Sequence, residues 1–148
     1  MYTKINEKDS IMKLGAIYSK EKTTFTLFSP VADSVFVIFY DKGNDSAETG
    51  RLEMMRGEGE LRSIFSATAE GNLDGVYYTY EVHTADGTFS SHDPYARVCG
   101  VNGHRSMVID LSKTDPDGFA DEDRPKLADT MSMVITEVSV ADVSAGAS

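Results

Sequence analysis

Short runs of β-branched and aromatic residues, separated by turn-prone glycine, aspartate and asparagine, make up most of this chain. Thr23–Phe28 and Val35–Tyr40 are two such runs, and Val76–Thr84, which carries three tyrosines, is the strongest. Asp86-Gly87 then predicts a hairpin turn. Further strands are expected over 52–55, 62–69, from 88 onward, and over 105–111. Because no long stretch shows helical periodicity, the pattern predicts an all-β sandwich or barrel.

A polar segment divides the chain after Leu111. Residues 113–130 contain two prolines and several acidic residues, a composition typical of a linker. We therefore expect an N-terminal lead over 1–13, a β-module over 14–112, this linker, a strand within 131–143 and a frayed tail over 144–148. Met133–Val140 is apolar on both faces. Either this extra C-terminal strand returns to an edge of the sandwich, or its proper partners are absent.

The charge balance narrows the classes of ligand. The 148 residues carry a formal net charge of -10, and no cluster of lysine and arginine forms a basic patch. Nucleic acid and anionic membrane surfaces repel such a chain, so neither is expected as a partner. Uncharged sugars are not excluded by this charge.

The remaining composition points to neither a disulfide nor a metal. Cys99 is the single cysteine and is expected to be a small buried hydrophobe. The three histidines match no metal-ligand spacing, so no metal site is expected. The N-terminal residues lack the apolar region of a signal peptide. We therefore expect a cytoplasmic protein, or a secreted one if the chain is a fragment of a larger exported enzyme.

Three stretches share their order and spacing with a known family: Leu14–Phe25, Leu73–Val82, and Asp93–Arg97 with Gly100–Leu111. In this arrangement the chain resembles the family 48 carbohydrate-binding module, of the isoamylase N-terminal, early-set type. This module precedes the catalytic barrel of type I pullulanases, starch-debranching glycoside hydrolases of family 13. The resemblance implies an immunoglobulin-like β-sandwich of about seven to eight antiparallel strands, with the C-terminal strand as an addition. In such enzymes the barrel that follows the module, not the module itself, cleaves α-1,6 bonds in pullulan or branched starch.

The same resemblance implies that no catalytic centre lies in this chain. Glycoside hydrolysis needs two carboxyl groups across the scissile bond, and the family carries them downstream of the matched region. Ile135–Val143 resembles the first barrel strand and keeps Glu137 and Asp142. Thr136, Ser139, Ala141 and Val143 replace its aromatic, imidazole and guanidinium groups. We expect no enzymatic activity and no cofactor.

A sugar site is expected on the strongest strand and the loops beside it. Starch modules stack sugar faces on tryptophan or tyrosine, but this chain has no tryptophan, and Phe28 and Phe65 stand at the family's tryptophan positions. A phenyl ring offers less area and no N–H donor. The resemblance places candidate ligand-binding residues at Tyr77, Glu81, Phe89 and Asn102. The alternative is that these are ordinary solvated side chains.

A second candidate surface lies on Val35–Tyr40. Phe36, Ile38 and Tyr40 alternate away from the expected core yet are apolar, which indicates a covered interface. The cover could be another subunit, a catalytic domain or the chain's own 133–140 segment. Three functions therefore stay open. They are a non-catalytic α-glucan-binding accessory module, a docking or oligomerisation domain, and a truncated fragment of a debranching hydrolase without independent activity.

Overall fold

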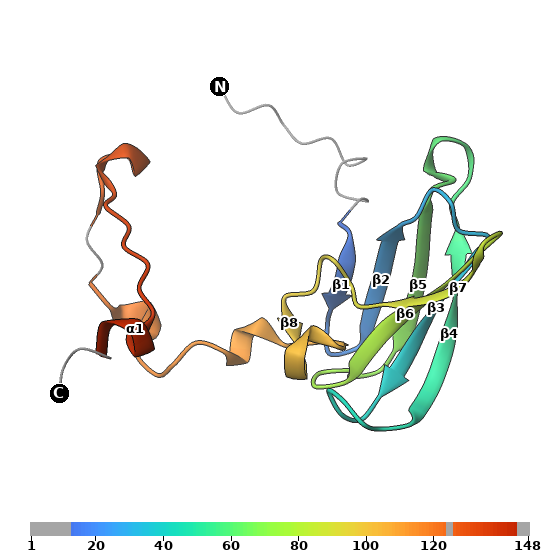
Figure 1. Cartoon of the computed structure of the whole chain (residues 1–148), viewed down its shortest axis with the longest axis horizontal. Helices are drawn as coiled ribbons and strands as arrows, with labels where there is room; N and C mark the ends of the chain where they lie inside the picture. The colour runs from blue at the N-terminus through green and yellow to red at the C-terminus, as the bar shows by residue number, and fades with distance from the viewer. Residues whose placement is uncertain (1–12, 124–125, 145–148) are drawn as a thin grey trace. The chain divides into compact units, whose positions relative to one another are not determined.

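The structure is a computed structural model of the chain, and it describes residues 13–123 and 126–144 (Figure 1). The chain divides into two compact units, Met1–Thr114 and Asp115–Ser148. All nine strands of the described residues belong to the first unit. They are β1 (Gly15–Tyr18), β2 (Lys22–Phe28), β3 (Ser34–Tyr40), β4 (Glu48–Arg56), β5 (Ile64–Glu70), β6 (Tyr77–Thr84), β7 (Gly87–Ser91), β8 (Val98–Cys99) and β9 (Ser106–Met107).

The strands follow the order β1-β2-β5-β4-β3-β6-β9-β8, with β7 on β6, and every pair is antiparallel. β4 joins the two layers. It pairs with β3 along most of its length and with β5 only at Met55 and Arg56. The sheet therefore folds over itself there, which makes the all-β sandwich that the alternating pattern predicts. Short 3-10 turns at Gly59–Leu61 and Val101–Gly103 connect strands, and a third at Leu111–Lys113 follows β9.

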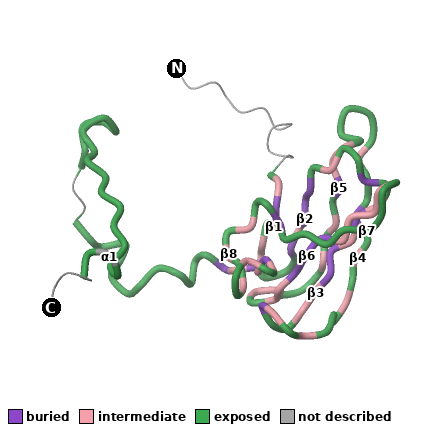
Figure 2. The backbone as a smooth tube through the Cα atoms, viewed as in Figure 1, coloured by how far each residue is buried: buried purple, intermediate pink, exposed green. Residues whose placement is uncertain are grey.

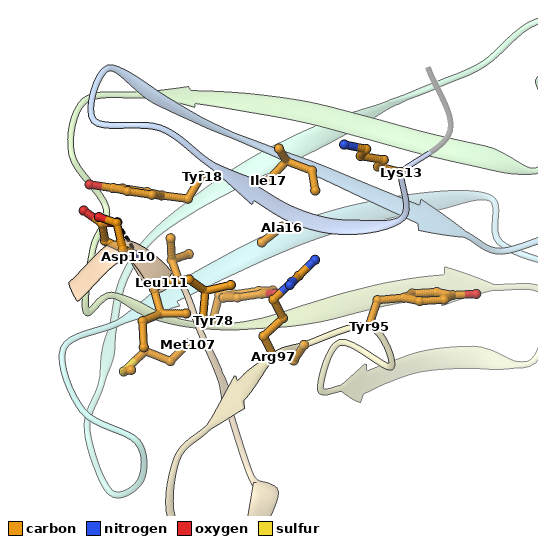
Figure 3. Close-up of a pocket in the computed structure, with 14 residues that line it drawn as sticks. Lys13, Ala16, Ile17, Tyr18, Tyr78, Tyr95, Arg97, Met107, Asp110 and Leu111 are labelled. Atoms are coloured by element: carbon orange, nitrogen blue, oxygen red, sulfur yellow. Dashed lines mark hydrogen bonds between the residues drawn. The ribbon is translucent and has the colours of Figure 1, made fainter. Parts of the chain in front are cut away.

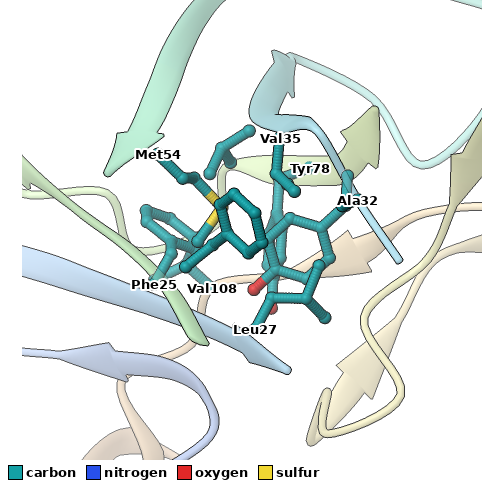
Figure 4. Packing of buried hydrophobic residues seen from close by; sticks show 10 residues of the cluster. Phe25, Leu27, Ala32, Val35, Met54, Tyr78 and Val108 are labelled. Atoms are coloured by element: carbon teal, nitrogen blue, oxygen red, sulfur yellow. The ribbon is translucent and has the colours of Figure 1, made fainter. Parts of the chain in front are cut away.

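The core follows the two-residue period of the strands. Val35 and Val37 of β3 are fully buried, as are Phe25 of β2 and Phe65 of β5. Tyr78 and Tyr80 of β6 meet them, and the Phe25 and Tyr78 rings lie edge to face with centroids 5.0 Å apart (Figure 4). Burying each of these large side chains contributes on the order of 2 kcal/mol.

One buried carboxylate satisfies the two core tyrosines. Tyr78 and Tyr80 both donate their hydroxyls to Oδ2 of Asp93, at 2.7 and 3.2 Å. Asp93 is only 2% exposed, and its Oδ1 accepts the backbone N–H of Tyr95 at 2.8 Å. Burial, and next the charge of Asp93, raises the pKa of both tyrosines far above the ordinary value. The Asp93-Pro94-Tyr95 turn is thereby anchored to the core.

The expected C-terminal strand does not form. Met133–Ser139 has no regular secondary structure, and Val140–Ser144 is a short helix, α1. The unit from Asp115 onward otherwise holds only the 3-10 turns Phe119–Asp121 and Thr130–Ser132 among its described residues. Side chains there are exposed, Val134 to 93% (Figure 2). The physical reason is that a strand needs a neighbour for its N–H and C=O groups, and this segment has none in the described residues of its unit.

The expectation for Cys99 is also wrong, because this cysteine is exposed. It lies on β8, a two-residue strand at the end of the sheet order. An edge strand this short leaves its outward side chain uncovered, however apolar that side chain is.

Candidate functional site

Alternation along β6 separates its core side chains from a second set. Tyr78 and Tyr80 point inward, so Tyr77, Thr79, Glu81 and His83 belong to the opposite face. The β3–β6 register places Tyr40 beside Tyr77, Ile38 beside Thr79 and Phe36 beside Glu81. We call the face formed by these side chains of β3 and β6 the outer face. It combines aromatic rings with hydrogen-bonding groups over the length of two strands.

Arginines of the same unit cover the apolar stripe of Phe36, Ile38 and Tyr40. The Arg51 guanidinium lies 5.9 Å from the Phe36 ring centroid, and that of Arg105 lies 3.5 Å from the Tyr40 centroid. Ile38, between them, is only 3% exposed. Each guanidinium–ring contact stabilises the face by about 0.5–1 kcal/mol at such partly exposed positions. These guanidinium groups already lie over the stripe, which the sequence pattern assigned to an interface.

Glu81 is held at one end of the outer face. Its Oε1 lies 2.9 Å from Nε2 of His83 and accepts Nη1–H of Arg51 at 3.4 Å. Arg51 is itself fixed by Glu48, whose two oxygens accept Nε–H and Nη2–H at 2.8 and 2.9 Å. The hydrogen bond from Arg51 lowers the pKa of Glu48. Within the described part of the chain Oε2 of Glu81 has no partner, so it is free to accept a ligand hydroxyl.

At the other end of the outer face, Gly43 lies against both the Tyr77 ring and Gly100, which precedes the Asn102 turn. A Cβ added to Gly43 would lie 2.9 Å from the Gly100 Cα and 3.1 Å from Cε1 of Tyr77. Asn102 is exposed in the 3-10 turn that follows Gly100, with a left-handed φ of 53°. Only residues without a Cβ allow the two loops to approach this closely. The glycine contact therefore places the Asn102 turn beside Tyr77.

Arg105 holds the loop between β3 and β4 at the same end of the outer face. Its Nη1 donates to the Lys42 carbonyl at 2.7 Å and to Oγ of Ser46 at 2.8 Å, and its Nη2 donates to the Ser46 carbonyl at 2.9 Å. The loop between β3 and β4 is thus tied to the strand that follows the Asn102 turn. Sequence reasoning missed both Arg105 and Arg51, because their roles depend on which strands are neighbours.

Phe89 does not join the other three predicted residues. In the β6–β7 register it lies opposite Val82, whose side chain packs on the core, whereas Glu81 lies opposite Ser90. Phe89 therefore belongs to the face opposite Glu81, and its ring is 53% exposed. Of the two phenylalanines at the family's tryptophan positions, Phe65 is core and Phe28 is exposed.

The family model that matches the chain is carbohydrate-binding module 48, the isoamylase N-terminal domain, over residues 13–96. The chain belongs to this family. The match confirms the resemblance seen in the sequence, and the immunoglobulin-like sandwich is the fold of the similar regions of solved pullulanases. The matched range contains β1–β7 and the Asp93 turn, and with them Tyr77, Glu81 and Phe89.

Curated and solved relatives of this module-48 chain are pullulanases. Pullulanase A of Streptococcus pneumoniae serotype 4 is 31% identical over 74% of this chain and 9% of its own length. Pullulanase 1 of Arabidopsis thaliana, a chloroplastic protein, is 26% identical over 89% of this chain and 14% of its own.

Among solved structures, apo pullulanase of Paenibacillus barengoltzii superposes with a TM-score of 0.71 at 33% identity, over 78% of this chain and 17% of that one. The same enzyme is solved with maltohexaose and α-cyclodextrin. This module-48 chain spans less than a fifth of these relatives, and the part that it matches is a non-catalytic module. Within the residues that the structure describes, no helix has the length and apolar character needed to cross a membrane.

Proposed function

We propose that this chain is an accessory module that binds α-glucans without transforming them, and that the outer face is its binding surface. The observation that carries the proposal is that the partly exposed Tyr77 and Glu81 lie on one face of β6, on either side of the buried Thr79, with the Asn102 turn near Tyr77. Membership of a carbohydrate-binding family supports this function, and the outer face carries the aromatic and hydrogen-bonding side chains that sugar binding requires. The net charge of -10 does not oppose an uncharged ligand.

Binding on this face needs no chemical step. Tyr77 offers an aromatic ring to the C–H surface of a sugar, whereas the Tyr40 ring is already covered by Arg105. Oε2 of Glu81 accepts a hydroxyl proton, and the Asn102 amide both donates and accepts. Arg51 and His83 fix the Glu81 carboxylate before the ligand arrives, so little side-chain freedom is lost on binding.

Isothermal titration of the 148-residue chain with maltoheptaose and with β-cyclodextrin tests the proposal. We expect saturable binding with a Kd of about 0.1–1 mM, equivalent to about 4 to 5.5 kcal/mol. Glu81→Gln should weaken it about tenfold, because a hydrogen bond to a charged group is lost. Asn102→Gly should weaken it while keeping the left-handed φ. No heat with either ligand at high concentration would sink the proposal.

Phe89→Ala is the matched control for the surface. Its ring is exposed but belongs to the opposite face, so we expect the affinity to be unchanged. Loss of binding in this variant with full binding in Glu81→Gln would move the site to the β7 edge and contradict our choice of face.

A second candidate function, docking on a protein partner, is favoured by the segment after Thr130. Met131, Val134 and Ile135 are strongly exposed there, and exposed apolar residues in one segment are typical of a surface that another chain covers. Light scattering of the purified chain separates the two candidates, since a sugar-binding module needs no partner. A monomer at all concentrations would remove self-association as the role of this segment.

A further inference from the structure

A pocket of about 400 Å³ lies between β1 and the β8–β9 edge, away from the outer face. β1 and β8 are the two ends of the strand order, so the sandwich is open between them. The buried Tyr78 and Val108 line its interior. The exposed Lys13, Tyr95 and Arg97 line its opening, and Ala16 and Tyr18 also line the pocket (Figure 3). This volume falls within the range of small-molecule sites, which is about 300–1,000 Å³.

Two cationic side chains, Arg97 and Lys13, line one end of this pocket. Arg97 reaches from the loop after Asp93 toward β1, on the side where Lys13 and Tyr95 lie (Figure 3). Neither Lys13 nor Arg97 makes an ion pair with any residue that the structure describes. The chain as a whole is strongly acidic, so two cations with no ion-pair partner in the described part of the chain are a local reversal of its charge. A guanidinium beside an ammonium favours an anionic group with several acceptor oxygens.

The other end of the pocket offers groups that suit hydroxyls. Asp110 accepts N–H and Oγ–H of Ser112 at 3.1 and 2.6 Å, and these hydrogen bonds lower the pKa of its carboxyl group. Ser112 also lines the pocket. The Tyr18 hydroxyl is fixed by donation to Oδ1 of Asn72 at 2.9 Å, which orients its ring on the wall. Nζ of Lys113 lies 3.9 Å from Oδ2 of Asp110. The pocket therefore has two cations at one end, a carboxylate balanced by Lys113 at the other, and aromatic rings between them.

We propose that this pocket binds a small sugar phosphate, with the phosphate at Arg97 and Lys13 and sugar hydroxyls toward Asp110. A phosphate alone would use only the cationic end and leave the ring-lined part empty. A neutral sugar would leave both cations unpaired. A hexose phosphate carries a group for each end. This pocket contains no residue of the outer face, so the sugar phosphate proposal is independent of the glucan proposal.

Nuclear magnetic resonance of the full chain tests the inference, with glucose 1-phosphate, glucose and inorganic phosphate as separate probes. We expect glucose 1-phosphate to shift the amide signals of Ala16, Arg97 and Ile109, and both other probes to bind at least about tenfold more weakly. Added salt should weaken the interaction, because the cations are at the opening. Maltoheptaose should not compete.

Arg97→Gln should weaken glucose 1-phosphate binding about tenfold, and Arg97→Lys should restore part of it, because the charge returns without the planar fork. Arg62→Gln is the control, since Arg62 is exposed on the turn after Gly59–Leu61 and does not line the pocket. Circular dichroism checks that each variant is folded. Equal affinity for inorganic phosphate and glucose 1-phosphate would overturn the sugar phosphate assignment and leave a simple anion site. Absence of shifts at these amides, or an unaffected Arg97→Gln variant, would overturn the site itself.

Discussion

Gly43 and Gly100 meet backbone to backbone at the end of the outer face. A Cβ built on Gly100 would lie 2.6 Å from the Cα and 2.9 Å from the carbonyl oxygen of Gly43. Both neighbours are backbone atoms, which cannot turn aside as a side chain can. The approach joins the loop after β3 to the turn that carries Asn102. The shape of the proposed sugar surface therefore depends on two residues that contribute no side chain.

Replacing Gly100 with alanine should force these loops apart. We expect Gly100→Ala to lower the free energy of unfolding by about 1–3 kcal/mol, the usual cost of overpacking. It should also weaken any glucan binding, because the Asn102 turn moves away from Tyr77. Urea denaturation gives the first quantity. Gly50→Ala is the matched control: its added Cβ would only touch the Phe39 ring at 4.0 Å, so this variant should be neutral or slightly stabilised. Equal stability of the two variants would refute the importance of the glycine contact.

The Asp93 carboxylate should be the most sensitive polar group of the core. Asp93→Ala leaves the hydroxyls of Tyr78 and Tyr80 buried without an acceptor, and it frees the Tyr95 N–H. We expect a loss of about 3–5 kcal/mol in the free energy of unfolding, measured by urea denaturation. Tyr80→Phe removes only the longer of the two tyrosine bonds and should cost about 1 kcal/mol. If both substitutions cost the same, the carboxylate does not act as a shared acceptor.

Alkaline pH should unfold this protein through the same two tyrosines. Burial raises the pKa of Tyr78 and Tyr80 in the folded state, so the folded chain keeps protons that the unfolded chain releases above about pH 10. Their stabilising effect is fully present below that pH and is lost as the pH rises above it. The melting temperature should fall as the pH is raised from 8 to about 11.5, and it should fall less steeply in the Tyr80→Phe variant. A flat profile in the unsubstituted chain would contradict this.

The alternation of apolar residues was sufficient to predict the core but not the faces beyond it. Val35, Val37, Tyr78 and Tyr80 are buried as their two-residue period requires. The period does not determine which strands are neighbours, so the contacts of Arg51 with Phe36 and of Arg105 with Tyr40 could not be predicted from the sequence. The face of Phe89 likewise depends on the hairpin register, which sets Val82 rather than Glu81 opposite it.

The C-terminal segment shows a different limit. Met133–Val140 has the composition of a buried strand, but strand formation depends on a partner that composition does not report. The pocket between β1 and β9 could not be predicted either. Its cations, Lys13 and Arg97, are far apart in sequence and line the same pocket because the two ends of the strand order leave the sandwich open between them.

Removing the Arg51 side chain should uncover the apolar stripe of the outer face. Arg51 lies over Phe36 and pairs with Glu48 and Glu81, so Arg51→Ala exposes Phe36 and part of Ile38 while freeing two carboxylates. We expect increased binding of the dye ANS and a concentration-dependent rise in mass by light scattering, because newly exposed apolar area favours self-association. Arg62→Ala changes charge equally on an exposed turn and should show neither effect. An Arg51→Ala variant that stays monomeric and binds no more dye than Arg62→Ala would show that Ile38 is covered by its strand neighbours alone.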